Sequence, residues 1–311
     1  MGRVVVAGVV SVRIARPVES FPVPHRPSEK QPGQISVRLA STGWTITRTL
    51  QQLGSDVDLA TYVGADPLGH LAVTGLRQHG LYRATTQVCA EQPRAVVLYD
   101  PKGNRAGARD LRFVPDLCYP IDVFTAALDA APGCDLAVLG NVAFTRPLIA
   151  AAQRRGVPIA TDVQLATDID TSPHQDWLRA AHLLACSHEA LTGGAEDWIV
   201  RLWHRFGTPL ALVGCGGRGA LVGVRATRQI WHVPAAPPRG VVYTSGAGDT
   251  LFASFIHHYL VSGDPVLAAR YGVLAASWKV GGLPDEEPGV PAAVLAELVS
   301  GLGLPAADRL R

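Results

Sequence analysis

Cysteine is scarce in this chain of 311 residues, and the few cysteines present have no regular spacing. Cys89, Cys118, Cys134, Cys186 and Cys215 are an odd number, lie far apart and include no C-x-x-C pair. This pattern excludes a disulfide framework and a cysteine zinc site, and it is typical of a protein in a reducing compartment. We therefore expect a cytoplasmic protein.

Long runs of positive charge and long apolar runs are also missing. The formal net charge is only +2 and no basic run exceeds a few residues, so we expect no nucleic-acid partner. No window has the length of a transmembrane helix, so we expect no membrane association. The apolar start, GRVVVAGVV, lacks a clean cleavage site, and we interpret it as a first strand and not as a signal peptide.

What is present is a globular composition, with 48% hydrophobic and 17% charged residues. Strands are predicted at residues 4–10, 57–63, 135–140, 157–162, 182–186 and 209–214. Helices are predicted at residues 45–53, 71–79, 147–155, 173–181, 195–206, 250–262 and 264–280. This alternation with short connections indicates a parallel sheet covered by helices on both faces. The last residues, GLGLPAADRLR, are expected to fray.

Two segments interrupt the alternation. Residues 15–35 are rich in Pro, Ser and Gln, which is typical of a loop or an edge excursion. Residues 84–113 alternate between apolar and polar positions around the turn PKGN, and they contain Arg94, Arg105, Arg109 and Arg112. Such a pattern predicts antiparallel hairpins, and their insertion into the alternation indicates a lid or a side sheet.

The stretch YTSGAGDTLFASFIHHYLVSG, residues 243–263, joins a turn of small residues to an amphipathic helix that ends at Gly263. The free N–H groups and the positive dipole end of such a helix make an anion site. Asp249 in this turn has two interpretations. It is either a base that takes a proton from an attacking hydroxyl group, or an N-cap residue of a buried helix.

Other motifs narrow the chemistry. The chain has neither a G-x-x-x-x-G-K-[ST] phosphate loop nor a G-x-S-x-G nucleophile elbow. Gly214, Gly216 and Gly219 match G-x-G-x-x-G, but a strand-like ALVGVRA follows, so we predict a tight turn and not a dinucleotide site. Asp162 ends the strand VPIATD at the same sheet edge, as a site residue or as an ordinary polar strand end. Glu189 is placed in the first turn of a helix, where an acid needs no function.

Taken in order, several stretches resemble the ribokinase-like (PfkB) carbohydrate kinases. TSGAGDTLFASF resembles the family's D-T-x-G-A-G-D signature, and the resemblance extends over most of the chain through VVVAG, QQLGSDVDLATYVGADPLG, GVPIATD, LACSHEALTGG and GCGGRGA. The resemblance implies an α/β fold, a ribokinase-like three-layer α/β/α sandwich with a mainly parallel central sheet and a small β-sheet lid. It also implies a single domain over residues 1–311, with lid segments at roughly 11–35 and 84–113.

The same resemblance implies transfer of the ATP γ-phosphoryl group to a hydroxymethyl group of a sugar or sugar-like molecule. Asp249 matches the catalytic base, and Gly246, Ala247 and Gly248 match the anion hole. Glu189 matches the acid that organises Mg²⁺ through water. The residues that match the nucleotide site are Gly214, Gly216, Gly219, Thr244, Gly272 and Ser277.

The sequence departs from the family pattern mainly at positions where the family binds a cation, a metal ion or the sugar. Tyr243 stands where the signature begins with an Asp linked to a monovalent-cation site, and Cys186 replaces the Asn of N-x-x-E. Arg13 replaces a sugar-binding Asp, and an arginine cannot accept a hydrogen bond.

In the acceptor region, the family's usual G-G-x-x-x-N is replaced by Ala40, Ser41, Thr42, Gly43, Trp44 and Thr45. We expect Arg13 and Trp44 to select an acidic, phosphorylated or flat acceptor and not a plain ribose-like or fructose-like sugar. Two alternatives stay open, namely a nucleoside kinase and a non-catalytic small-molecule-binding pseudokinase. A homodimer is expected from the family.

Overall fold

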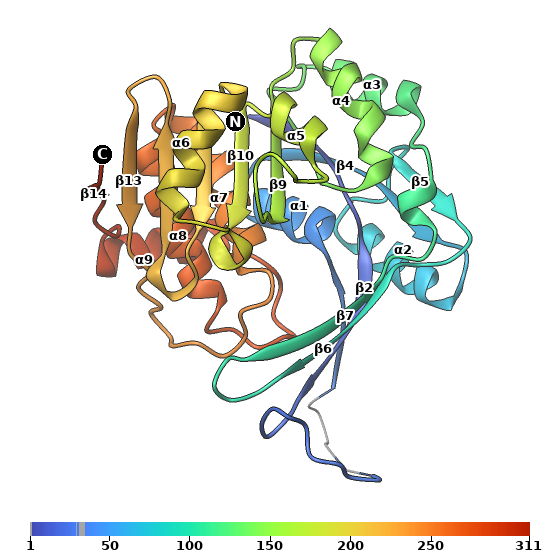
Figure 1. Ribbon diagram of the computed structural model, residues 1–311. Coiled ribbons are helices and arrows are strands. Elements are labelled where there is room, and N and C mark those ends of the chain that lie inside the picture. Colours follow the sequence, from blue (N-terminus) through green and yellow to red (C-terminus); the bar gives the residue numbers. More distant parts are fainter. Residues whose placement is uncertain (1, 29, 31–34) are drawn as a thin grey trace.

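The computed structural model describes residues 2–28, 30 and 35–311, and within them it has two sheets (Figure 1). The larger sheet has ten strands in the order β14-β13-β12-β11-β10-β9-β8-β1-β4-β5. Their bounds are β1 Arg3–Ala7, β4 Asp56–Gly64, β5 Thr86–Cys89, β8 Leu136–Leu139, β9 Ile159–Leu165, β10 Leu183–Ser187, β11 Leu210–Gly214, β12 Ala220–Val224, β13 Gln229–Val233 and β14 Asp308–Arg309.

Most of this sheet is parallel. Every neighbouring pair from β11 to β5 is parallel, whereas β12, β13 and β14 extend it antiparallel at one edge. The central parallel strands β1, β8, β10 and β11 are mostly apolar and buried, as expected for strands that are covered on both faces. The strand-like segment after the glycine turn is confirmed as β12. The expected frayed C-terminus is wrong, because Asp308 and Arg309 pair with β13 and close the edge.

Helices cover both faces of the large sheet, which confirms the three-layer fold. The side chains of β1 show why: Val5 belongs to one core cluster, and Val4 and Val6 to the other. The first cluster packs under α3 Ile121–Asp129, α4 Arg146–Arg154, α5 Gln175–Ala180 and α6 Ala195–Phe206. The second packs under α1 Thr42–Gln52, α2 Pro67–Gln78, α7 Ala247–Ser262 and α8 Pro265–Lys279. α9 Ala292–Leu302 packs against α8 in a third cluster.

The smaller sheet projects beyond the carboxyl ends of the parallel strands (Figure 1). Its order is β3-β2-β6-β7, with β2 Ser11–Pro17, β3 Ser36–Ala40, β6 Arg94–Tyr99 and β7 Arg105–Asp110. The antiparallel hairpin predicted around PKGN is confirmed as β6 and β7.

Two details differ from the expected segments. β3 belongs to the small sheet although it lies beyond residue 35. β5 lies within the expected hairpin region, but it joins the large sheet parallel to β4. In addition, part of residues 15–35 lies outside the described residues. Among the described residues, no helix is long and apolar enough to cross a membrane.

Candidate active site

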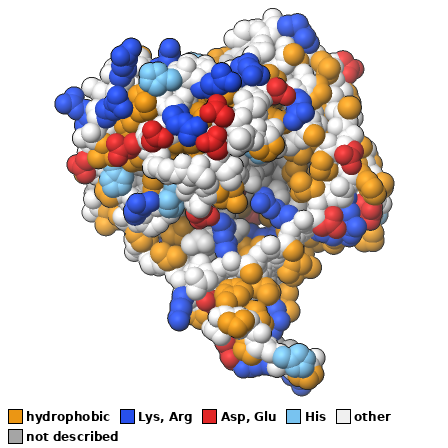
Figure 2. All heavy atoms as spheres, viewed as in Figure 1, with side chains coloured by type: hydrophobic (Ala, Val, Ile, Leu, Met, Phe, Trp, Pro, Cys, Tyr) orange, Lys and Arg blue, Asp and Glu red, His pale blue; other side chains and the backbone are white. Residues whose placement is uncertain are grey.

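A cleft of about 1250 Å³ lies between the two sheets. Its floor comes from the carboxyl ends of β9, β10 and β11, and one wall comes from the small sheet. Figure 2 shows the surface hollowed between the main body and the projecting small sheet, with Lys and Arg side chains at its margin. Ligands of open parallel sheets bind at this edge, so the cleft is the candidate site.

The turn before α7 lies on the cleft. Gly246 has a φ of 83° and is the N-cap of α7, and Thr250 donates to its carbonyl from both N–H and Oγ1. A positive φ is available to glycine at little cost, which explains the residue type. The N–H of Ala247 donates to the carbonyl of Thr244 at 3.2 Å. The N–H groups of Gly246 and Gly248 bond to no residue that the structure describes, so they are available to an anion.

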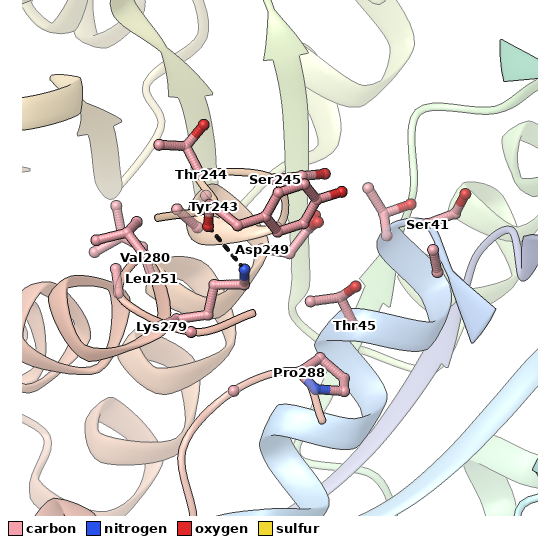
Figure 3. Close-up of a pocket in the computed structure, with 18 of the residues that line it drawn as sticks. Ser41, Thr45, Tyr243, Thr244, Ser245, Asp249, Leu251, Lys279, Val280 and Pro288 are labelled. Carbon is pink, nitrogen blue, oxygen red and sulfur yellow. Dashed lines mark hydrogen bonds between the residues drawn. The ribbon is translucent and has the colours of Figure 1, made fainter. Parts of the chain in front are cut away.

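Asp249 lies in the first turn of α7 and caps nothing, so its interpretation as an N-cap residue is wrong. Its carboxylate lines the cleft beside the turn (Figure 3). The pKa of Asp249 is raised to about 7, mainly by burial and also by the negative charge of Asp162, against the opposing positive charges of Arg109, Arg105 and Lys279. A base with a pKa near neutrality is suited to take a proton at physiological pH.

Asp162 lies within β9 near the same edge, and the predicted strand end at Asp162 is wrong because β9 continues to Leu165. Burial raises the pKa of Asp162 to about 6, and the hydrogen bond that its carboxylate accepts from the N–H of Gln164 opposes this. The structure therefore places Asp162 close enough to Asp249 for its negative charge to raise the pKa of Asp249. Of the two interpretations of Asp162, its place in the cleft favours a site residue.

The glycine turn between β11 and β12 forms the far end of the cleft. Gly216 and Gly219 have φ of 58° and 95°, and a Cβ atom on Gly219 would lie 2.0 Å from the carbonyl oxygen of Val233. The imidazole Nδ1 of His188 lies 3.0 Å from the carbonyl oxygen of Gly214 and ties the turn to β10. Gly216 is exposed and lines the cleft without a side chain, which lets a phosphate or a base approach its backbone, whereas Gly219 is buried and packs against Val233.

Glu189 is exposed on the cleft wall and lies in the first turn of a helix as predicted, although this helix is a short 3-10 turn, His188–Ala190. Mg²⁺ in kinase sites is held by one or two carboxylates together with waters and substrate phosphates. Glu189, Asp162 and Asp249 line the cleft, so it offers carboxylates of the kind that such a site uses singly or in pairs. No cluster of three metal-ligating side chains occurs among the described residues.

The acceptor side is formed by α1 and β2. Ser41 is the N-cap of α1, and Thr45 approaches the α7 turn so closely that a Cβ on Gly246 would lie 3.6 Å from its methyl carbon (Figure 3). Trp44 lines the cleft, but it is only 4% exposed. Arg13 does not point into solvent, because its Nη2 donates to the carbonyl of Pro284 at 2.7 Å.

Most of the residues expected at the site lie on this one cleft. They are Arg13, Trp44, Thr45, Glu189, Gly214, Gly216, Gly219, Thr244, Gly246, Ala247, Gly248, Asp249 and Ser277. Gly43 and Gly272 do not line it. A Cβ on Gly43 would lie 2.6 Å from the backbone of Gly8, and one on Gly272 would lie 2.9 Å from the carbonyl oxygen of Leu251. These two glycines therefore allow close backbone packing behind the cleft wall.

Sequence reasoning missed several charged groups of the cleft. Lys279, Arg239 and Glu286 line it, although no motif singles them out. The pKa of Lys279 is lowered to about 7, mainly because the ammonium is buried. The positive charges of Arg13, Arg239 and Arg105 also lower this pKa, and the negative charge of Glu286 opposes them. Arg105 and Arg109 were noted as residues of the hairpin, but only the folded small sheet places them opposite Asp249. A local sequence pattern gives no sign of such long-range charge contacts.

Comparison with known proteins agrees with this geometry. Residues 1–283 match the family described as pfkB family carbohydrate kinase. The chain is 29% identical over 281 residues to the acarbose 7(IV)-phosphotransferase of Actinoplanes sp., which covers 88% of this chain and 91% of that protein.

Solved structures share the fold. A microbiome-derived acarbose kinase superposes with a TM-score of 0.84 at 23% identity, over 96% of this chain and 99% of that chain. A ribokinase of Thermotoga maritima superposes with a TM-score of 0.76 at 16% identity, over 97% and 100%. Because the family match spans most of the sequence, the chain belongs to the pfkB family of carbohydrate kinases, which are phosphotransferases.

Proposed function

We propose that this kinase transfers the γ-phosphoryl group of ATP to a hydroxymethyl group of a sugar or sugar-like molecule, with Asp249 as the base. One observation carries the proposal: the Asp249 carboxylate, with its pKa raised to about 7, lies beside two free backbone N–H groups at the N-terminus of α7. A base and an anion site at one point are what phosphoryl transfer to an alcohol requires.

The chemistry divides between these groups. Asp249 accepts the proton of the acceptor hydroxyl group as the oxygen attacks the γ-phosphorus atom, and the bond from that phosphorus to the bridging oxygen of the β-phosphate breaks, so that ADP leaves. The N–H groups of Gly246 and Gly248 hold the equatorial oxygens of the phosphoryl group, where the negative charge is spread. Arg105 and Arg109 add positive charge from the small sheet. Because the N–H of Ala247 is already engaged with Thr244, we assign it no anion contact in this state.

The nucleotide side is proposed at the opposite end of the cleft. Gly214, Gly216 and Gly219 line the cleft there without side chains, and Thr244 and Ser277 line the adjoining wall. Gly272 supports this wall from behind. Glu189 would hold Mg²⁺ through water, and the ion would neutralise phosphate charge.

The acceptor is proposed to be a sugar or a sugar derivative. The cleft volume exceeds that needed for a nucleotide alone, since ligand pockets usually measure about 300–1,000 Å³. Two relatives are acarbose kinases by name, so sugar derivatives larger than a monosaccharide belong among the first candidates. The small exposed fraction of Trp44 favours contact through its edge, which gives a nucleobase little stacking surface. Arg13 is held by Pro284, so its role in acceptor selection stays a hypothesis.

A homodimer in the cytoplasm is also proposed. Ile14 pairs with Val37 and with Val96 in the small sheet, so these three side chains share one face. They are 38%, 46% and 46% exposed. Apolar patches of this kind on a sheet are often covered by a partner. Light scattering of the purified protein tests this, and Ile14→Lys should yield monomers if the face is the contact.

Phosphate transfer tests the function. Wild type and Asp249→Asn are incubated with ATP and Mg²⁺ and a panel of monosaccharides, oligosaccharides, sugar acids, sugar phosphates and nucleosides. Transfer to a carbohydrate that depends on Asp249 supports the proposal. Transfer to nucleosides alone favours the nucleoside kinase, and ATP binding without transfer to any acceptor favours the pseudokinase.

A further inference from the structure

Lys279 is the last residue of α8, and its side chain reaches back to the active-site turn. Its ammonium donates a hydrogen bond of 3.1 Å to the backbone carbonyl oxygen of Tyr243 (Figure 3). The chain has only two other lysines, Lys30 and Lys102, and both are exposed. An ammonium that serves only the helix C-terminus could stay in water, so its position inside the cleft calls for another reason.

Tyr243 is held on both sides by the end of α8. The N–H groups of Val242 and Tyr243 donate to the carbonyl of Val280 at 2.7 and 2.9 Å, and Lys279 binds the Tyr243 carbonyl. The next residue, Thr244, already accepts a hydrogen bond from Ala247. Through these successive bonds, the position of the Tyr243 carbonyl fixes the start of the turn that contains the free N–H groups.

The ammonium is placed there at a cost that no ion pair offsets. Burial lowers the pKa of Lys279 to about 7, and Arg13, Arg239 and Arg105 repel it. Among the described residues, no carboxylate lies within 4.0 Å of its Nζ. Glu286, whose negative charge raises the pKa of Lys279, is itself paired with Arg239 at 2.8 Å. Groups kept at such a cost in a cleft are often functional.

These residues do not fit a monovalent metal ion at this point. The side chain of Tyr243 offers no carboxylate, and its ring already contacts Lys279 at 4.7 Å and Arg13 at 5.2 Å. The Tyr243 carbonyl oxygen, which could otherwise bind a metal ion, accepts a hydrogen bond from the Lys279 ammonium. A positive charge from the chain itself therefore stands beside the turn.

We propose that Lys279 is a positioning residue, which through the Tyr243 carbonyl holds the anion-binding turn in place and makes an added monovalent cation unnecessary. The inference rests on the proposed function. In its protonated form, Lys279 also adds a positive charge near the transferred phosphoryl group, where preorganised charge is most effective.

Chemical rescue tests the inference. Lys279→Ala leaves a space that ammonium or methylammonium can enter, and Lys102→Ala is the matched control at an exposed lysine. We expect Lys279→Ala to lower kcat by about 10²-fold, the usual effect of a small misplacement, with little change in the KM for ATP. Ammonium or methylammonium should restore part of kcat, whereas choline at equal ionic strength should not. Lys102→Ala should match wild type in every salt.

Wild type provides the second arm. Its rate should be the same in potassium, sodium and choline chloride. Activation of wild type by potassium overturns the inference, and so does a Lys279→Ala variant with wild-type kcat or with a loss that no small cation restores. If Lys279→Ala does not fold, the rates of wild type in the three salts test the inference. A second comparison then uses Lys279→Arg, which should keep more activity than Lys279→Met.

Amide hydrogen exchange separates this inference from the proposed function. If wild type phosphorylates no acceptor, the proposed function fails, but the turn can still be examined. Exchange at residues 243–248 should be faster in Lys279→Ala than in wild type, and methylammonium should slow it again. Equal exchange in the two proteins would contradict the positioning role, whatever the activity.

Discussion

The guanidinium of Arg109, in the small sheet, donates a hydrogen bond of 3.1 Å to the side-chain oxygen of Gln164, at the carboxyl end of β9. Gln164 has a φ of 58°, unusual for a residue other than glycine, and its N–H donates to Asp162 at 2.7 Å. The contact joins the two walls of the cleft and places a positive charge where it lowers the pKa of Asp249.

Arg109→Met should therefore move the pH dependence of activity. Asp249 must be ionised to act as a base, so kcat/KM should fall as the pH drops through about 7. Without Arg109, the pKa of Asp249 rises, and the midpoint of this fall should move to higher pH. The pH profile of kcat/KM measures it. Arg112→Met is the control, because Arg112 pairs with Asp110 outside the cleft and should leave the midpoint in place.

Asp249→Asn should stabilise the fold at neutral and alkaline pH. The pKa of Asp249 is about 7 in the folded state and 3.8 ordinarily, so between these values the folded state binds a proton that the unfolded chain has lost. The stability of wild type therefore declines as the pH rises across this window, and the variant lacks this decline. The gain in Tm should be largest above pH 7 and should vanish toward pH 4. A difference that does not change with pH would contradict the raised pKa.

Two glycine variants separate the anion site from the fold. A Cβ on Gly248 would meet no atom within 4 Å, so Gly248→Ala should keep or slightly raise stability, by up to about 1 kcal/mol. Its methyl group would nevertheless lie at the proposed phosphoryl site, and kcat should fall. Gly219→Ala, where φ is 95° and the Cβ would lie 2.0 Å from an oxygen, should destabilise the fold by more than about 1 kcal/mol. Urea unfolding and transfer rates distinguish the two outcomes.

Much of the fold could be predicted because its signals are local. The apolar run of β1 and the amphipathic pattern before Gly263 depend only on neighbouring residues. β14 could not be found this way, since Asp308 and Arg309 have no strand pattern and pair with β13 only in the folded chain. α3 and α9 were missed as well, although both contain several apolar residues.

The candidate site likewise contains residues that a local motif predicts and residues that only the tertiary structure brings together. Asp249 and its glycine turn form one continuous motif, so the sequence alone pointed to them. Lys279 lies 36 positions after Tyr243, and a single lysine at a helix end is ordinarily a partner of the helix dipole. Its contact with the turn depends on how α7 and α8 pack. The engagement of Arg13 by Pro284, 271 positions away, depends on tertiary structure in the same way.

The most direct test of the account is the turnover of Asp249→Asn on the acceptor that wild type phosphorylates, measured together with ATP affinity. We predict a fall in kcat of about 10²–10⁴-fold, the usual contribution of a positioned base, with ATP affinity nearly unchanged. Turnover close to that of wild type in a folded Asp249→Asn protein would contradict the assignment of Asp249 as the base.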